Sequence, residues 1–340
     1  MIKEAIATIL RGGQLQAAEA EAAIDEIMEG QATPAQIAGF AIALAFRGET
    51  SEELAGCARA MRRHATPVPV GRQDAIDNCG TGGDGLSTFN ISTTAAFVAA
   101  GAGCAVAKHG NRAASSRCGS AEVLEALGIA LDLPPAATGR AVDEIGIGFL
   151  YAPLLHGALR HAAGPRKELG VRTVFNLLGP LANPAGVRRQ VIGVARPEHV
   201  RLVAEALRDL GSEHALVLHG AGGADELTLA GENLLCELKD GTLREMTLDA
   251  RELGLAAAPI GALAGGDAGE NARITQAVLA GERGPQRDVV ALNAAAAIYV
   301  GGRARDLAEA LLLAEDAIDS GAGAQHLAQL AAFGRREMVG

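Results

Sequence analysis

The sequence predicts an α/β protein with a small all-helical N-terminal domain and a larger domain. The larger domain is expected to hold a central mixed, mostly parallel sheet flanked by helices. Two observations support this prediction. Up to about residue 65, apolar residues recur at the three-to-four spacing of a helix. From Asp74 onward, short apolar runs alternate with helical segments, as is typical of an α/β fold. We therefore expect a helical domain at 1–70 and an α/β domain at 71–340.

The helical domain is predicted to contain four helices, at residues 2–10, 17–28, 34–46 and 51–64. The third begins with Thr33-Pro34, which places a capping hydroxyl ahead of a first-turn proline. Ser51, followed by Glu52 and Glu53, marks the start of the fourth. The proline-containing segment 67–71 is predicted to link the two domains.

The larger domain is predicted to alternate strands and helices. Its candidate strands are 75–79, 104–107, 190–194, 215–218 and 226–229. Its candidate helices are 93–101, 120–127, 134–142, 197–210, 271–280, 288–300, 303–319 and 326–333.

The composition argues against several classes of protein. The 340 residues carry 30 Lys plus Arg against 40 Asp plus Glu, a net charge of −10. We expect no nucleic-acid partner, because that affinity comes mostly from basic side chains. The five cysteines include no CxxC pair, so free thiols in a reducing cytoplasm are expected. The N-terminal apolar run is too short for a signal peptide. The longest uncharged stretch, 85–107, holds many hydroxyl groups and glycines, so we expect no membrane span.

A glycine-rich segment, Gly80-Thr-Gly-Gly-Asp-Gly85, directly follows the first predicted strand. Glycines let backbone N–H groups approach an anion closely, because no Cβ is in the way. The pattern matches GxGxxG, but a dinucleotide site also needs an acidic residue about 20 positions on. No Asp or Glu lies between Asp84 and Glu122, which argues against such a site. An anion site and an ordinary glycine turn both stay open here.

The segment Thr88–Thr94 leads into an apolar helix. Asn90, Ser92 or Thr93 could simply cap that helix. A helix start with free N–H groups and hydroxyls is also a site for phosphate or magnesium-phosphate. Its closeness to the glycine-rich segment favours the second interpretation.

Two further segments carry charge. Lys108-His-Gly-Asn-Arg-Ala-Ala-Ser-Ser116 places two cations, an amide and hydroxyls in one loop after an apolar strand, which indicates a polyanion site. Asp225-Glu226 lies in a glycine-rich loop, and Mg²⁺ takes one or two carboxylates together with substrate phosphates. Together, these segments predict a phosphorylated substrate that carries a magnesium-bound pyrophosphate. No pattern of a covalent nucleophile is present, so electrostatics and positioning are expected to drive the reaction.

Six segments carry a resemblance to a known family. They are Asp77-Asn-Cys-Gly-Thr-Gly-Gly-Asp84, Asn90-Ile-Ser-Thr93, Lys108–Ser116, Gly119-Ser-Ala-Glu-Val-Leu-Glu-Ala-Leu-Gly128, Arg172-Thr-Val-Phe-Asn-Leu-Leu-Gly-Pro-Leu-Ala-Asn-Pro184 and Asp225-Glu226. In order and spacing, from about residue 10 to 335, the chain resembles the anthranilate phosphoribosyltransferases. The resemblance implies transfer of phosphoribose from phosphoribosyl pyrophosphate to the anthranilate amine in tryptophan biosynthesis. It also implies a cytoplasmic homodimer, with helices from about 153–185 packing onto the helical domain and the donor bound in domain 71–340.

The resemblance also implies roles for individual residues. The phosphoribosyl donor should contact Gly80, Gly83, Asp84, Thr88, Asn90, Ile91, Ser92, Thr93, Lys108, His109, Gly110, Asn111, Arg112, Ala113, Ala114, Ser115, Ser116 and Ser120. Anthranilate should contact Gly80, His109, Asn111 and Arg166. Mg²⁺, up to two ions per monomer, should be held by Ser92, Asp225 and Glu226. No residue is expected to be a nucleophile or essential base, whereas Lys108 and Arg112 should act electrostatically.

Several alternatives stay open. Without the resemblance, Arg166 could equally be a surface charge paired with Glu168 or Asp143, and His156 is more often a structural histidine. Glu122 stands where the family usually has Asp, and its longer side chain could shift the donor loop. The rival functions are a phosphorolytic pyrimidine nucleoside phosphorylase of the same architecture and a non-catalytic nucleic-acid-binding paralogue.

Overall fold

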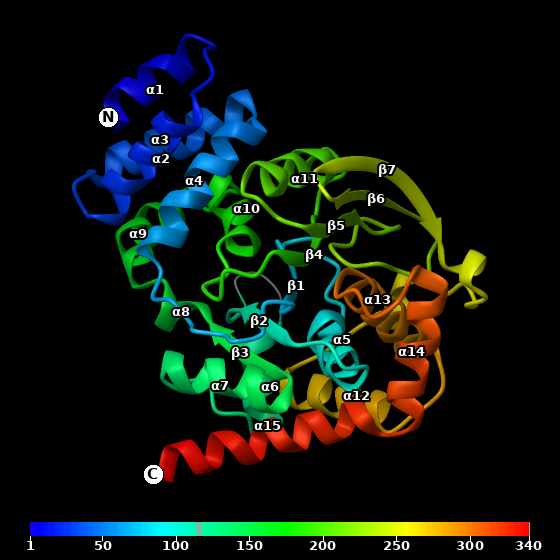
Figure 1. Ribbon diagram of the computed structural model, residues 1–340. Coiled ribbons are helices and arrows are strands. Elements are labelled where there is room, and N and C mark those ends of the chain that lie inside the picture. Colours follow the sequence, from blue (N-terminus) through cyan, green and yellow to red (C-terminus); the bar gives the residue numbers. More distant parts are fainter. Residues whose placement is uncertain (114–116, 340) are drawn as a thin grey trace.

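The computed structural model describes residues 1–113 and 117–339 (Figure 1). The chain begins with four helices: α1 (Ile2–Leu10), α2 (Ala17–Met28), α3 (Pro34–Arg47) and α4 (Ser51–His64). All four predicted helices are confirmed to within one residue. The Thr33 hydroxyl caps α3 by accepting from the N–H of Gln36, as its position before a proline predicts. The cap of α4 is Thr50 rather than Ser51, which is the first residue inside the helix.

The rest of the chain builds a seven-stranded sheet in the order β3-β2-β1-β4-β5-β6-β7. Its strands are β1 (Ile76–Gly80), β2 (Val106–Gly110), β3 (Ile147–Tyr151), β4 (Arg189–Gly193), β5 (His214–His219), β6 (Glu232–Lys239) and β7 (Thr242–Asp249). The first five strands are parallel to one another. β6 pairs antiparallel with β5, and β7 pairs antiparallel with β6. The predicted fold class, with its mixed and mostly parallel sheet, is confirmed.

The strand predicted at 226–229 is wrong. These residues form an irregular loop, because their backbone groups bond to side chains instead of to a neighbouring strand: Leu227 to Asn293, and Thr228 to Asn233. Neither β3 nor the β6–β7 hairpin was among the strands predicted from the sequence. The hairpin turn Asp240-Gly241 has both residues at positive φ, 50° and 78°, as in a type I′ turn, so its Asp-Gly pair was a usable signal.

Helices cover both faces of the sheet. They are α5 (Ile91–Gly101), α6 (Ser120–Ala126), α7 (Pro135–Ile145), α8 (Ala152–Leu155), α9 (Arg160–Leu169), α10 (Val174–Leu181), α11 (His199–Asp209), α12 (Ala268–Leu279), α13 (Pro285–Val300), α14 (Leu307–Asp319) and α15 (Ala322–Val339). Short 3₁₀ turns lie at Gly157–Leu159, Ala250–Leu253 and Ile260–Leu263. No helix of the described residues is long and apolar enough to cross a membrane.

Alternate residues of the central strands enter two different cores. Leu216 packs against α5 and α13, whereas Val217 packs with α11 and the N-terminal helices. This second core also takes in α9 and α10, which contact α3 and α4 (Figure 1). The core therefore runs across the boundary that we predict near residue 70, and that boundary stays a prediction.

The five parallel strands end at one edge of the sheet. Gly80 of β1 lies beside Gly193 of β4, and Gly110 of β2 lies beside Tyr151 of β3. Loops that follow parallel strands meet at this edge, which is where open α/β sheets bind their ligands. The glycine-rich segment, the basic loop and the Asp225 loop are therefore brought to one place.

Candidate active site

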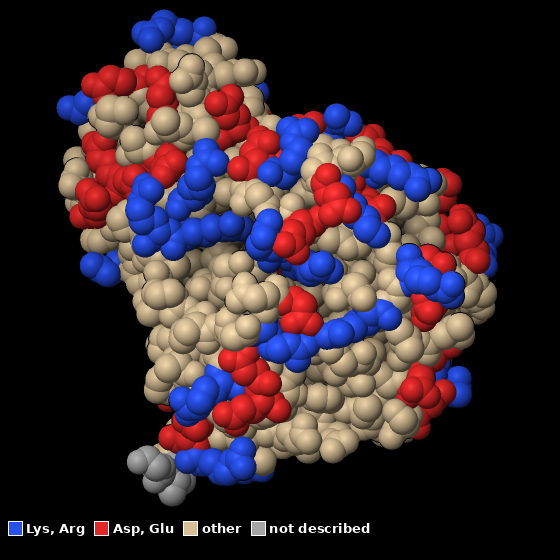
Figure 2. All heavy atoms as spheres, in the orientation of Figure 1, with Lys and Arg blue, Asp and Glu red and all other residues tan. Residues whose placement is uncertain are grey.

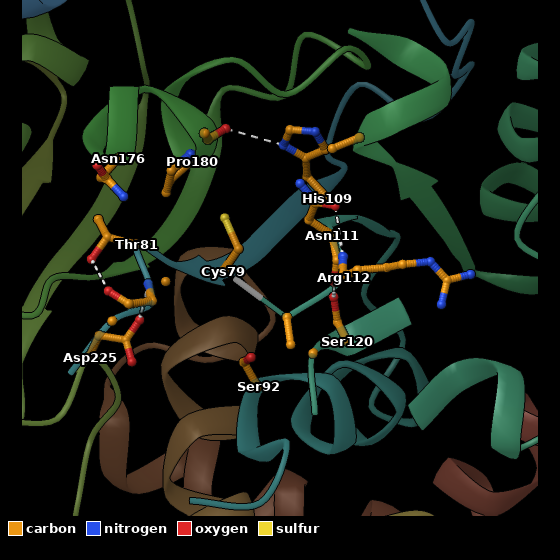
Figure 3. Close-up of a pocket in the computed structure, with 18 of the residues that line it drawn as sticks. Cys79, Thr81, Ser92, His109, Asn111, Arg112, Ser120, Asn176, Pro180 and Asp225 are labelled. Atoms are coloured by element: carbon orange, nitrogen blue, oxygen red, sulfur yellow. Dashed lines mark hydrogen bonds between the residues drawn. The ribbon is translucent and has the colours of Figure 1, made fainter. Parts of the chain in front are cut away.

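A cavity of about 370 Å³ lies at this edge, between the sheet and helices α8 to α10 (Figure 3). The predicted site residues that line it are Gly80, Gly83, Asp84, Thr88, Asn90, Ser92, Thr93, Lys108, His109, Gly110, Asn111, Arg112, Ala113, Ser120, Arg166, Asp225 and Glu226. Ile91 does not line it, since its side chain is fully buried in the core. Ala114, Ser115 and Ser116 lie outside the described residues. Segments more than 140 residues apart in sequence thus share one pocket.

The glycine-rich segment needs its glycines for close approach. A Cβ on Gly80 would lie 2.1 Å from the Asp225 Oδ2 atom, and a Cβ on Gly83 would lie 1.8 Å from an Arg172 nitrogen. Gly82 and Gly83 also have φ of 67° and 75°. The N–H of Gly82 donates to Asp225 Oδ2 at 2.7 Å. The turn is therefore fitted against the carboxylate loop.

The start of α5 faces the same pocket. Asn90 occupies the N-cap position, but its side chain makes no capping bond: it accepts from Asn271 and donates to the Cys118 carbonyl instead. The interpretation of Asn90 as a plain helix cap is therefore wrong. The N–H of Ser92 donates to Glu226 Oε1 at 2.8 Å. The positive end of α5 thus meets a carboxylate, as the helix dipole favours.

The two carboxylates sit close together at the pocket floor. Burial, with the neighbouring charge of Asp84, raises the pKa of Asp225. Burial, with the neighbouring charge of Asp225, raises the pKa of Glu226. A cation would relieve this repulsion, and carboxylate and hydroxyl oxygens are the ligands that Mg²⁺ prefers. Asp225, Glu226 and Ser92 therefore fit a magnesium ion. Among the residues the structure describes, no group of three or more His, Cys, Asp or Glu side chains could hold a metal, so further ligands must come from substrate or water.

Two neighbouring residues of β2 form another wall of the pocket. The Lys108 ammonium donates to the Asn78 carbonyl at 2.7 Å, and burial lowers the pKa of Lys108. His109 bonds through Nδ1 to the Gly179 carbonyl at 3.1 Å, and its Nε2 lies 3.2 Å from His156 Nε2. Burial lowers the pKa of His109 to about 3 and that of His156 to about 4. Both rings are neutral at physiological pH. Because a carbonyl oxygen can only accept, His109 Nδ1 carries the ring proton, and His109 Nε2 accepts the proton of His156.

The backbone of the basic loop lines the pocket, but the charged end of the Arg112 side chain does not lie in it. That guanidinium pairs with both Glu125 oxygens, at 2.7 and 2.8 Å, and points away from the cavity (Figure 3). Glu122 accepts from the N–H groups of Ala113 and Gly119, at 3.2 and 3.0 Å. The longer side chain of Glu122 therefore holds the two described ends of this loop together.

Arg166 enters the pocket from α9. It is half-buried and lies 5.4 Å from the centre of the Phe175 ring. Within residues 1–113 and 117–339 it forms no ion pair, and burial lowers its pKa. Among these residues the alternative pairing is found with neither Glu168 nor Asp143, and Asp143 accepts instead from the backbone N–H groups of Gly71 and Arg72. Arg166 is a cation placed to receive an anionic ligand.

The structure also adds lining residues that the sequence analysis did not assign: Met61, Cys79, Thr81, Gly82, Ser87, Phe89, Cys118, Gly119, Ala152, His156, Leu159, Arg172, Phe175, Asn176, Gly179 and Pro180. Five of these lie in the 172–184 motif, so membership in that motif was the available signal. Arg172 donates to the Gly82 carbonyl at 2.7 Å and thereby ties that motif to the glycine-rich turn. Met61 comes from α4 and had no signal in the sequence.

Comparisons with known proteins agree with this architecture. Residues 3–65 match the helical bundle domain of the glycosyl transferase family, and residues 72–324 match its a/b domain. Fold and site together therefore define a glycosyltransferase. The anthranilate phosphoribosyltransferase of Moorella thermoacetica is 54% identical, over 98% of both chains. That of Desulforudis audaxviator is 53% identical, over 99% of this chain and 97% of its own.

Solved structures agree as well. The anthranilate phosphoribosyltransferase of Thermus thermophilus superposes with a TM-score of 0.93 at 48% identity, covering 97% of this chain and 99% of its own. The Saccharomyces cerevisiae enzyme in complex with PRPP and Mg gives a TM-score of 0.90 at 27% identity, over 98% of both chains. The chain belongs to the anthranilate phosphoribosyltransferase family.

Proposed function

We infer that the chain transfers phosphoribose from phosphoribosyl pyrophosphate to the amine of anthranilate, releasing pyrophosphate, in tryptophan biosynthesis. The observation that carries this inference is that one cavity joins the glycine-rich turn, the carboxylate pair and Arg166, which forms no ion pair with any described residue. Relatives of the same name are 50–54% identical over nearly the whole chain. The yeast enzyme has been solved with PRPP and Mg, and with 4-fluoroanthranilate. Nothing in these matches favours a nucleoside phosphorylase or a nucleic-acid-binding paralogue. On the face in Figure 2, acidic side chains are interspersed among the basic ones.

The donor is proposed to bind along the glycine-rich turn, the start of α5 and the basic loop. Backbone N–H groups there would hold its phosphates, because glycine and a helix N-terminus both present donors to an anion. Ala114, Ser115 and Ser116 stay part of this proposal. Lys108 contributes positive charge from the floor, whereas Arg112 acts on the donor only after leaving Glu125.

Magnesium is proposed to lie between the donor and the carboxylate pair, held by Ser92, Asp225 and Glu226, with up to two ions per monomer. When bound, it supplies positive charge that stabilises the leaving pyrophosphate. The chain contributes the rigid placement of the carboxylates against the Gly82 and Ser92 N–H groups.

Anthranilate is proposed to bind on the α9 side, with its carboxylate on Arg166 and its ring near Gly80, His109 and Asn111. A guanidinium fork suits a carboxylate. The bond from the ribose anomeric carbon to pyrophosphate breaks with its electron pair leaving on pyrophosphate, and the amine lone pair forms the new C–N bond. His109 is a poor base, because its Nε2 lone pair is engaged by His156 and its pKa is about 3. The amine proton therefore leaves to water or pyrophosphate after the bond has formed.

The test is the loss of anthranilate fluorescence on mixing protein, anthranilate, phosphoribosyl pyrophosphate and Mg²⁺. We expect a loss that needs both donor and Mg²⁺ and that disappears in an Asp225→Ala/Glu226→Ala double variant. Controls contain EDTA or lack the donor. A folded protein that consumes no anthranilate would overturn the proposal, and phosphate-dependent nucleoside cleavage would then be assayed.

A homodimer and a cytoplasmic location are also proposed. On α1 and α3, which pack together, Leu10 is 73%, Ile42 39% and Phe46 94% exposed, and such apolar side chains suit an interface between two copies. The five cysteines form no disulfide, which suits a reducing compartment. Light scattering should show a dimer that a Phe46→Glu variant weakens. A monomeric parent chain would contradict the first proposal.

A further inference from the structure

The carboxylate pair lies on a segment without regular secondary structure, so something outside that segment must hold it in place. Leu227, which directly follows Glu226, connects the carboxylate pair to the hydrophobic core. Leu227 is fully buried, and both of its backbone polar groups bond to one side chain, that of Asn293 on α13. The carboxylates are therefore held from a helix that lies far away in the sequence.

Asn293 uses its whole amide group in this role. Its Oδ1 accepts from the N–H of Leu227 at 3.0 Å, and its Nδ2 donates to the Leu227 carbonyl at 2.9 Å and to the Val289 carbonyl at 2.8 Å. The orientation of the amide is unambiguous, because exchanging its O and N atoms would set three like groups against each other. The Asn293 side chain is only 6% exposed. Its bond to Val289, one turn earlier in α13, fixes it on a rigid helix.

Asn293 contacts the carboxylate loop from outside the large cavity. It does not line the large cavity. It lines a second, smaller cavity of about 10 Å³ behind the pair, together with Asn78, Ser92, Asp225 and Glu226. Asn293 therefore lies outside the cavity in which the donor and anthranilate are proposed to bind. Any influence on the reaction must therefore act through Glu226 and the loop that carries it.

The opposite side of the loop is held rigidly as well. A Cβ on Gly193 would lie 1.5 Å from the Asp225 carbonyl oxygen, and a Cβ on Gly220 would lie 1.9 Å from that of Glu226. Asn233 ties Ala221 to Thr228 at the base of the loop. Of these supports, Asn293 is the side chain that hydrogen-bonds to the peptide between Glu226 and Leu227, so its loss should displace the Glu226 carboxylate.

We propose that Asn293 is a positioning residue for magnesium, which sets the place of the Glu226 carboxylate through the paired Leu227 backbone. The proposal rests on the proposed function, because it assumes magnesium at Asp225 and Glu226. Side chains that orient metal ligands typically change metal affinity ~10–100-fold when they are replaced. Replacing Asn293 should thus raise the Mg²⁺ concentration that the protein requires and leave its affinity for anthranilate unchanged.

The test compares Asn293→Leu, which keeps the branched shape and removes all three hydrogen bonds, with Asn293→Ser, which leaves room for a water and threatens folding less. Binding of phosphoribosyl pyrophosphate is measured by calorimetry at a series of Mg²⁺ concentrations, without anthranilate, so that no transfer occurs. We expect the half-saturating Mg²⁺ concentration to rise ~10-fold or more in both variants. In steady-state assays the anthranilate KM should stay within ~2-fold of the parent, and excess Mg²⁺ should restore kcat.

The matched control is Arg287→Met on the same helix. Arg287 is 2% exposed and bonds to Asp319 at 2.9 Å, so this variant destabilises α13 without reaching the carboxylates. Its melting temperature should fall while its Mg²⁺ requirement stays that of the parent. If the Asn293 variants melt earlier and keep the parent Mg²⁺ requirement, or if Arg287→Met raises it equally, Asn293 is only structural. A parent chain that binds no donor with Mg²⁺ would instead defeat the proposed function, and this inference with it.

Discussion

Arg166 is the residue that should bind the carboxylate on the proposed acceptor side of the pocket. Its guanidinium is half-buried without an anionic partner in the described part of the chain, and burial already lowers its pKa. A cation left in this state is stabilised when a carboxylate arrives, because a charge-assisted hydrogen bond then replaces lost hydration.

Replacing Arg166 by Ala should therefore raise the anthranilate KM ~10–100-fold, the equivalent of one or two charge-assisted hydrogen bonds. The donor KM should change far less, since the donor is proposed to bind across the pocket. Steady-state kinetics with each substrate varied in turn would measure both constants. Equal effects on both would mean that the acceptor pocket lies elsewhere.

Asp225 and Glu226 should make stability depend on pH. The folded-state pKa values of both carboxyl groups are raised above the unfolded ones. Between about pH 4 and these raised pKa values, the folded state therefore holds more protons than the unfolded state. In EDTA, the free energy of unfolding should fall as pH rises through this window. Added Mg²⁺ should stabilise the protein more at about pH 8 than at about pH 6, because fewer protons must then be displaced.

Urea unfolding at several pH values would measure this dependence. An Asp225→Asn/Glu226→Gln variant should lose this part of it, since it has no carboxyl proton to release. Identical pH profiles for parent and variant would show that the two carboxylates keep ordinary pKa values.

Among the elements, the β6–β7 hairpin was the clearest omission of the sequence analysis. Periodicity located α1 to α4 almost to the residue, because amphipathic helices carry their own pattern. It placed a strand at 226–229, where apolar residues are buried by packing and satisfied by Asn293 and Asn233 side chains. A buried loop and a buried strand look alike in hydrophobicity, and only their hydrogen-bond partners distinguish them.

The hairpin turn should contribute to stability without touching the site. Gly241 has φ of 78° and open space around its Cα, so Gly241→Ala is penalised by backbone conformation alone. We expect a loss of ~1 kcal/mol in the free energy of unfolding, with unchanged kinetic constants. Gly164→Ala in α9, with open space and ordinary φ, should instead stabilise by up to ~1 kcal/mol. Equal effects of the two substitutions would contradict the assigned turn.

At the scale of the whole molecule, the N-terminal helices share a core with the sheet. Leu178 of α10 is fully buried in that core, and α10 packs against α4 and α3. Replacing Leu178 by Ala should lower the free energy of unfolding by ~2–5 kcal/mol. Because the core is continuous, calorimetry should show a single unfolding transition, and its melting temperature should be lower in the variant than in the parent. A separate early transition of the helical part would show that the two parts unfold independently.

The sequence by itself determined the fold class, the N-terminal helices, the family resemblance and nearly every residue that lines the cavity from the glycine-rich turn, the basic loop and the carboxylate pair. These motifs are local, because the glycines, the residues of the basic loop and the two carboxylates each lie together in a short stretch of the chain. Only the tertiary structure decided that the Arg112 guanidinium points outward to Glu125, that His109 is buried and bonded to His156, and that Asn293 holds the carboxylate loop. These are pairings between side chains and distant partners, and no local spacing encodes them.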